Sequence, residues 1–290
     1  KTIIFLGAGS EQAHVLQFAQ ELGYKTCVLD SNVNAIGKKF ADIFLECDIT
    51  STSDILKTVR DVSADGIFVH AIELSYVVSI VSEKLGLRGI KPEAAINSTN
   101  KLKRLEIFKK NNIPCVNFGS TNNINDAKKF AQDIGYPVVI KPVDNAGSRG
   151  VILVQNKLNL EKYFDESLSY CKNEKLVLIE EYLQGSQISS ETVIHKEKMF
   201  TTGFSDRNYE NMEKYQPYFV EDGGDMPTKI NSRLKSKTIE TIEKSISSLG
   251  LDFGAAKGDL LIHNDTPMVI EMASRTSGGR FATHQVPMST

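Results

Sequence analysis

The sequence has little that would tie it to disulfides, metal clusters or membranes. Cysteines are few and far apart, with no Cys-x-x-Cys pair, which favours free buried thiols in a reducing compartment: Cys27, Cys47, Cys115 and Cys171. No apolar run approaches the ~20 residues that a membrane helix requires, and no charged-then-apolar leader precedes the first expected strand. We therefore expect a cytoplasmic protein without a membrane partner.

The sequence also lacks an excess of charge of either sign. It has 34 Lys and Arg against 36 Asp and Glu, giving a formal net charge of -2 over 290 residues. Because no basic stripe is present, a nucleic-acid partner is not expected. The apolar content of 41% is sufficient for a large core, and the length suggests two or three packed units.

The first 97 residues alternate between strand and helix patterns. Strands are expected at residues 2–6, 26–30, 43–45 and 66–70, and helices at 11–22, at 52–62 and up to residue 85. This order is typical of a parallel sheet with crossover helices. It predicts a Rossmann-like α/β domain over residues 1–97.

The patterns in the rest of the chain predict two further structural units, at residues 98–186 and 187–290. Expected helices cover residues 98–111, 160–171 and 232–249, and expected strands cover 138–141, 151–155, 176–180, 188–195, 198–204, 253–262 and 268–271. The polar and aromatic segment 210–228 is expected to be a long surface loop. The chain starts at Lys1 and ends soon after the last strand, so we expect missing residues at the start and a truncated C-terminal unit.

Two carboxylates mark the last expected hairpin. Asp259 lies on one strand and Glu271 ends the next, with a turn over residues 264–267 between them. In the expected register the two side chains point to the same side and can share Mg²⁺, for which Mn²⁺ can substitute. Magnesium prefers one or two carboxylates together with phosphate and water oxygens. The pair therefore favours metal–nucleotide chemistry.

A lysine and a glycine-containing loop form the second candidate feature. Lys141 ends an apolar strand before Pro142, and residues 144–151 follow with Gly147 and Gly150. Backbone N–H groups of such a loop can surround phosphates while the lysine neutralises them. About 40 residues later, another apolar strand ends in the acidic pair Glu180 and Glu181.

This order of motifs resembles the ATP-grasp superfamily over essentially the whole chain. The resemblance implies an ATP-grasp fold, of mixed α/β and α+β class, behind the Rossmann-like domain. It implies the following roles: Lys101 and Lys141 at the ATP phosphates, Gly147, Ser148 and Gly150 in a lid, Glu180 with the backbone of Glu181 and Leu183 at adenine, Gln187 near ribose, and Asp259 and Glu271 as magnesium ligands. An ordinary solvated helix face stays an equal alternative for Lys101.

The sequence departs from the family pattern after Glu271. Ala273 stands where relatives usually have asparagine, which removes an expected oxygen ligand of a second magnesium. Arg275, followed by Gly278 and Gly279, resembles the amino-acid ligase branch, in which this arginine faces the carboxylate substrate. Glu73 is a further candidate, either for an amine or as a helix N-terminal acid.

The resemblance implies a carboxylate–amine ligase that uses Mg-ATP and an acyl-phosphate intermediate. Arg275, Lys141 and Glu271 would do the chemistry on small-molecule acid and amine substrates, in a chain that could form a homodimer. Two alternatives stay open: an enzyme that phosphorylates bicarbonate, similar to carbamoyl phosphate synthase or biotin carboxylase, and a degenerate ATP-binding scaffold without activity.

Overall fold

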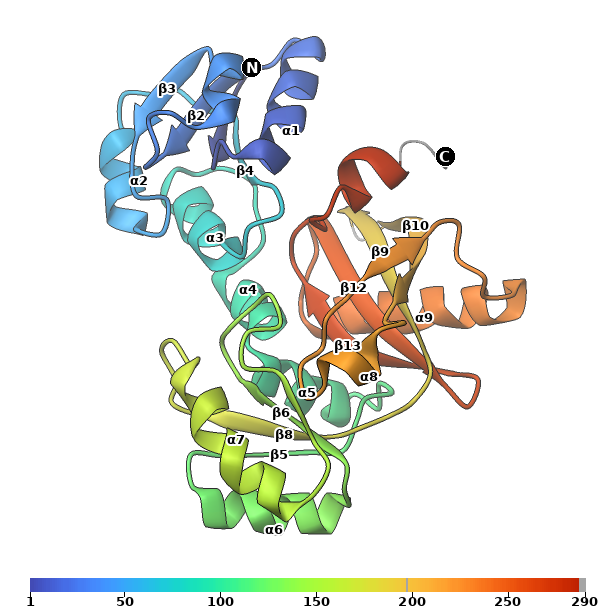
Figure 1. The fold of residues 1–290 in the computed structure, drawn as a ribbon. Helices are drawn as coiled ribbons and strands as arrows, with labels where there is room; N and C mark the ends of the chain where they lie inside the picture. Colours follow the sequence, from blue (N-terminus) through green and yellow to red (C-terminus); the bar gives the residue numbers. More distant parts are fainter. Residues whose placement is uncertain (197, 287–290) are drawn as a thin grey trace.

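The computed structural model describes residues 1–196 and 198–286. Its strands form three sheets that follow one another along the chain (Figure 1). The first sheet is parallel and the other two are antiparallel, as expected for an ATP-grasp fold with a Rossmann-like first domain. The boundaries 1–97, 98–186 and 187–290 stay a prediction.

The first sheet has the strand order β3-β2-β1-β4. Its strands are β1 (Thr2–Leu6), β2 (Lys25–Asp30), β3 (Ile43–Glu46) and β4 (Gly66–Val69), and its helices are α1 (Ser10–Glu21), the 3-10 helix η1 (Ile36–Phe40), α2 (Thr52–Thr58) and α3 (Ser75–Lys84). Ile4 packs with α2 and α3, whereas Phe5 packs with α1. Both faces of the sheet are therefore covered, as parallel sheets require.

Two short helices connect the first sheet to the second, α4 (Pro92–Thr99) and α5 (Lys101–Lys110). Asn100 separates them, and its side-chain oxygen accepts a hydrogen bond from the backbone N–H of Lys103. This N-cap starts α5 at residue 101 instead of continuing α4. α5 packs on the second sheet through Leu105 and on the third-sheet core through Phe108.

The second sheet has the order β5-β8-β6-β7. It contains β5 (Phe118–Thr121), β6 (Val138–Pro142), β7 (Ile152–Val154) and β8 (Val177–Glu181), with α6 (Ile124–Ile134) and α7 (Lys157–Ser169) packed on one face. The sequence patterns missed β5 and α6. β5 is only four residues long and contains Gly119, so it carries little strand signal.

The third sheet has the order β11-β10-β9-β12-β13. Its elements are β9 (Ser186–His195), β10 (Lys198–Asn208), α8 (Met212–Tyr215), β11 (Gly223–Asp225), α9 (Ser232–Ser248), β12 (Gly254–His263) and β13 (Thr266–Ala273), followed by the π-helix η2 (Phe281–Gln285). The prediction of one long loop over 210–228 was wrong, because α8 and β11 lie within it. Asn264 and Asp265 both have positive φ, which closes the β12–β13 hairpin tightly.

Within the described residues, no helix is long and apolar enough to cross a membrane. The expected cytoplasmic location and homodimer stay predictions.

Candidate functional site

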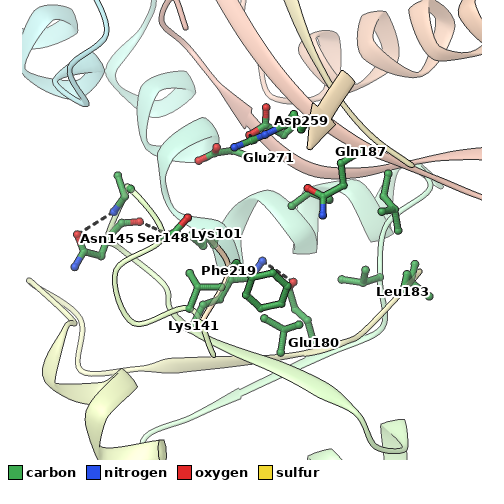
Figure 2. Close-up of a pocket in the computed structure, with 18 of the residues that line it drawn as sticks. Lys101, Lys141, Asn145, Ser148, Glu180, Leu183, Gln187, Phe219, Asp259 and Glu271 are labelled. Carbon is green, nitrogen blue, oxygen red and sulfur yellow. Dashed lines mark hydrogen bonds and ion pairs between the residues drawn. The ribbon is translucent and has the colours of Figure 1, made fainter. Parts of the chain in front are cut away.

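A cavity of about 270 Å³ lies where α5, the second sheet and the third sheet meet (Figure 2). Its wall brings together all but one of the residues that the resemblance assigned to ATP, magnesium and the acid substrate: Lys101, Lys141, Gly147, Ser148, Glu180, Glu181, Leu183, Gln187, Asp259, Glu271 and Arg275. The exception, Gly150, lies beside the cavity against Tyr170 and Pro142. Residues spread over 175 positions of the chain, from 101 to 275, thus share one space.

The predicted carboxylate pair lies on the cavity floor. Asp259 and Glu271 are direct partners across the β12–β13 ladder, so both side chains leave the sheet on the same face. Asp259 is buried, and its carboxylate accepts hydrogen bonds from Ser189 Oγ at 2.8 Å and Arg207 Nη1 at 2.5 Å. The juxtaposition expected from the hairpin is therefore observed.

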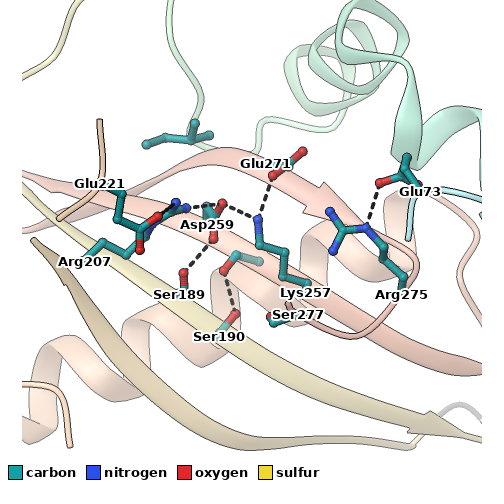
Figure 3. Close-up of polar contacts among 12 residues, drawn as sticks. Glu73, Ser189, Ser190, Arg207, Glu221, Lys257, Asp259, Glu271, Arg275 and Ser277 are labelled. Carbon is teal, nitrogen blue, oxygen red and sulfur yellow. Dashed lines mark hydrogen bonds and ion pairs between the residues drawn. The ribbon is translucent and has the colours of Figure 1, made fainter. Parts of the chain in front are cut away.

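Lys257 bridges the two carboxylates, and the sequence patterns did not identify it. Its Nζ lies 2.5 Å from Asp259 Oδ2 and 2.8 Å from Glu271 Oε2 (Figure 3). Burial lowers the pKa of Lys257, but the two carboxylates outweigh that effect and raise it. In turn the Lys257 ammonium holds the pKa of Glu271 well below its usual range. Lys257 and Glu271 are therefore both charged at neutral pH.

Lys141 and Glu180 form a buried ion pair on neighbouring strands β6 and β8. Lys141 Nζ lies 2.5 Å from Glu180 Oε2, and both side chains are less than a tenth exposed. Glu180, which the resemblance places at adenine, thus has a partner within the protein. Removing either group would leave a buried charge uncompensated, which is strongly destabilising.

Lys101 lies at the start of α5 and faces the cavity rather than solvent. Its backbone N–H donates to Val143 O at 2.9 Å, and its Nζ donates to Asn145 O. Burial lowers the pKa of Lys101 to about 8. An ammonium with so little water around it is well prepared to receive an anion.

The lid loop, defined as residues 144–151, has a fixed base and a free tip. At the base, the Asp144 carboxylate accepts backbone hydrogen bonds from residues 172–174, and Ser167 Oγ donates to Gly150 O at 2.8 Å. At the tip, Gly147 and Ser148 have positive φ, and a Cβ on Gly147 would meet open space. Motion is therefore expected at Gly147 and not, as the sequence suggested, equally at Gly150.

Residues 180–183 form the cavity wall expected to contact adenine. The backbone N–H of Glu181 already donates to Asn117 O at 2.9 Å, so it cannot donate to a base. The Glu181 carbonyl and the Leu183 backbone remain as candidate contacts. Apolar side chains line the same space and suit a flat ring: Val116, Val139, Phe219, Leu261 and Ile270.

Arg275 connects the cavity to the first domain. Its Nε lies 2.9 Å from Glu73 Oε2, in the segment between β4 and α3 (Figure 3). Nearby, Ser274 Oγ lies 2.8 Å from Ser98 Oγ, and His70 Nδ1 lies 2.7 Å from Thr276 Oγ1. The arginine therefore lies where the first domain meets the end of β13.

Glu191 on β9 is a buried acid at the same junction. Its carboxylate accepts the backbone N–H of Ser277 at 3.1 Å, and its side chain is shielded from water. Burial raises the pKa of Glu191 to about 7. No sequence motif marks this residue.

The donor set suits a magnesium ion that arrives with a nucleotide. Among residues 1–196 and 198–286, no group of three or more His, Cys, Asp or Glu side chains could hold a metal by itself. Asp259 and Glu271 supply two carboxylates, and Mg²⁺ usually takes the rest of its ligands from phosphates and water. The pair fits that role once a cation competes with Lys257 for an oxygen.

The cavity residues that the sequence patterns did not predict differ in how much local sequence signal they carry. Lys257 precedes Asp259 by two positions on a strand, so the period of two places it on the same face. Phe219 lies in the segment taken as a loop and carries no local signal. Arg207 was not missed altogether: as a lone arginine it was an open candidate for binding a carboxylate or phosphate, and β10 places it beside Asp259.

Comparison with known proteins agrees with this geometry. The chain is 27% identical over 186 residues to a formate-dependent phosphoribosylglycinamide formyltransferase of Prochlorococcus marinus, covering 63% of this chain and 47% of that protein. It is 26% identical over 246 residues to the alanine–anticapsin ligase of Bacillus subtilis, covering 77% and 51%. The chain thus spans about half the length of these curated relatives.

A solved structure shares the fold of nearly the whole chain. The L-amino acid ligase of Bacillus licheniformis superposes with a TM-score of 0.80 at 19% identity, over 98% of this chain and 69% of that one. In addition, the family model described as an ATP-grasp domain matches residues 98–279, which is more than half of the chain. The chain therefore belongs to the ATP-grasp family.

Proposed function

We propose that this chain is a Mg-ATP-dependent ligase that joins a carboxylic acid to an amino acid or similar amine through an acyl phosphate. The main support is the convergence of two lysines and a cross-strand carboxylate pair on one cavity, with Arg275 at its edge. The similarity to proteins named as amino-acid ligases supports the choice of an amine acceptor.

ATP would bind with its base in the apolar part of the cavity and its phosphates toward the lysines. Leu183 and the Glu181 carbonyl would contact the base, while Gln187 lies on the same wall for the ribose. Lys101, Lys141 and the N–H groups of the lid loop would neutralise the phosphates. Asp259 and Glu271 would hold Mg²⁺, which when bound neutralises charge on the β- and γ-phosphate oxygens.

In the first step, a carboxylate oxygen of the acid attacks the γ-phosphorus and ADP leaves with the electrons of the broken P–O bond. Arg275 can present two parallel N–H groups to the carboxylate and hold it for in-line attack. Its present partner, Glu73, would compete with the acid for the guanidinium. The acid would therefore bind at the junction between the first domain and β13.

In the second step, the amine nitrogen attacks the acyl carbon, and inorganic phosphate leaves as the nitrogen loses a proton. Water must be kept out, because it would hydrolyse the acyl phosphate. The lid loop would exclude it by closing over the phosphates.

The test is a screen for ADP and phosphate release with pools of carboxylic acids and amines. ADP should form only when an acid and an amine are present together, and mass spectrometry should then detect the amide product. The Glu240→Gln variant serves as a surface control, since this exposed glutamate on α9 pairs only with Lys244 among the described contacts.

Two outcomes would contradict the proposal. ADP release with bicarbonate alone would favour the bicarbonate-phosphorylating alternative. Background ATPase activity with every pool, despite measurable ATP binding, would favour a non-catalytic scaffold.

A further inference from the structure

Lys257 occupies the space between the two carboxylates that would hold metal. We infer that its ammonium takes the place of a second metal ion, so that this site works with one divalent cation per nucleotide. The inference rests on the proposed function, because it assumes that ATP and its magnesium bind in this cavity.

The register of the hairpin explains why a lysine fits here. Lys257 lies opposite Ala273, and Asp259 lies opposite Glu271, so the four side chains form one patch on one face. Ala273 offers a methyl group and no oxygen. Its small size leaves room for the Lys257 side chain to reach both carboxylates.

Both carboxylates on the floor already have cationic partners. Lys257 lies within 2.8 Å of Asp259 and Glu271, and Arg207 lies 2.5 Å from Asp259 while also pairing with Glu221. Of the two carboxylates, Asp259 has more hydrogen-bond donors, since its oxygens accept from Ser189, Arg207 and Lys257. Its side chain is 6% exposed, compared with 26% for that of Glu271.

A nucleotide-bound cation can therefore approach through Glu271, bringing its own phosphate and water ligands. A second divalent cation would need an anionic ligand at the position that the Lys257 ammonium occupies, and the ammonium would repel it. Lys257 touches the metal-binding acids and not the reacting atoms, so it acts as a positioning residue with a fixed single charge.

The experiment counts bound Mn²⁺ by electron paramagnetic resonance, using saturating β,γ-imido-ATP and the unmodified chain. We expect one Mn²⁺ per chain in the wild type and in Lys257→Arg, which keeps the positive charge. Combining Lys257→Met with Ala273→Asn removes the ammonium and adds an oxygen ligand beside it. That double variant should bind two Mn²⁺ per chain.

The single Lys257→Met variant is measured without nucleotide. Deleting a positive charge next to two carboxylates should tighten Mn²⁺ binding by about tenfold or more relative to wild type. Lys244→Met, which removes an exposed lysine of α9, should leave Mn²⁺ binding unchanged. Unchanged Mn²⁺ affinity in a folded Lys257→Met variant would contradict the inference.

The wild-type count decides the matter even where a buried substitution fails to fold. Two Mn²⁺ ions per wild-type chain would overturn the inference alone and leave the ligase proposal intact. A wild-type chain that binds no Mn²⁺ and no nucleotide would overturn the proposed function, and the inference with it.

Discussion

Several charged side chains of the cavity are largely buried and already partnered before any ligand binds. Lys141 has Glu180, Asp259 has Lys257 and Arg207, and Arg275 has Glu73. Such partners fix the position of each group, so little reorganisation is needed when phosphate charge enters. Ligand binding then exchanges one ionic partner for another.

Glu271→Gln tests the carboxylate pair. Glutamine keeps the size of the side chain but removes a negative charge from the cation site. Turnover should fall by on the order of a hundredfold, or ~3 kcal/mol, because charge stabilisation matters most in the transition state. ATP affinity should change less, since the lysines and the apolar wall still bind it. Steady-state kinetics measure the turnover, and calorimetry measures the ATP affinity. A Glu271→Gln variant that turns over ATP at the wild-type rate would rule out the magnesium assignment.

Glu191→Gln tests the buried acid through pH-dependent stability. The folded pKa of Glu191 is raised from 4.5 to about 7, so this group contributes stability that is fully present below pH 4.5 and lost as the pH rises through 7. The loss is of order 3 kcal/mol. Glutamine can still accept the Ser277 N–H but does not titrate.

The measurement is urea unfolding of both proteins between pH 4.5 and 8. The wild type should lose stability relative to Glu191→Gln across this range and then level off. Parallel stability curves for the two proteins would show that Glu191 titrates normally.

At the scale of the element, the lid loop combines a clamped base with an open tip. Its backbone at Gly147 and Ser148 lies in the left-handed region, and its base is tied to residues 167–174. Closure should therefore involve the tip alone.

Limited proteolysis tests the lid loop. Cleavage within residues 144–151, for example after Arg149, should be rapid without ligand and slow by about tenfold or more with Mg-ATP, because the tip then contacts phosphate. Gly147→Ala should slow closure of the lid loop without disturbing its base. The added Cβ meets no neighbouring atom, so the substitution is opposed only by the positive φ at this position. Cleavage that is indifferent to nucleotide would mark the loop as a static turn.

The cavity wall at residues 180–183 predicts that the protein binds ATP more tightly than GTP. In the proposed pose, the Glu181 carbonyl and the Leu183 backbone would match the edge of adenine and mismatch that of guanine, so GTP should bind at least about tenfold more weakly. Thermal unfolding with Mg-ATP or Mg-GTP at equal concentrations measures the difference. Equal shifts of Tm would remove the adenine assignment.

At the scale of the whole molecule, the first domain reaches the cavity only at its edge. Contacts from Glu73, Ser75 and His70 meet residues 274–276, after β13, whereas the nucleotide wall comes from α5 and the other two sheets. In the proposed reaction, ATP and the acid would thus be bound by different parts of the molecule.

Glu73→Gln tests that division. Glutamine can still accept from Arg275 Nε, but it removes the charge that competes with the acid substrate. The KM of the acid should fall by a fewfold, while the KM of ATP should stay within about twofold, because ATP in the proposed pose would not contact Glu73. A matched change in both KM values would indicate that the first domain also positions the nucleotide.

The sequence by itself determined the features that depend on short-range rules. Alternation along β12 and β13 and the turn at residues 264–267 placed Asp259 opposite Glu271, since hairpin register follows local geometry. The apolar run before Lys141 and the glycines after it likewise identified a strand and a loop. The ATP-dependent ligase, by contrast, was implied by the resemblance of this order of motifs to the ATP-grasp superfamily and not by the local signals alone.

Only the tertiary structure decided which charges share partners. Arg275 and Glu73 are 202 positions apart, and Arg207 and Asp259 are 52 apart, so no local period relates them. Their pairing depends on how separate sheets pack and on which charges lose water together. Lys257 shares a hairpin with both carboxylates, so the strand period places it on their face, but only the folded structure shows that it bridges them. A buried ammonium persists only where carboxylates surround it.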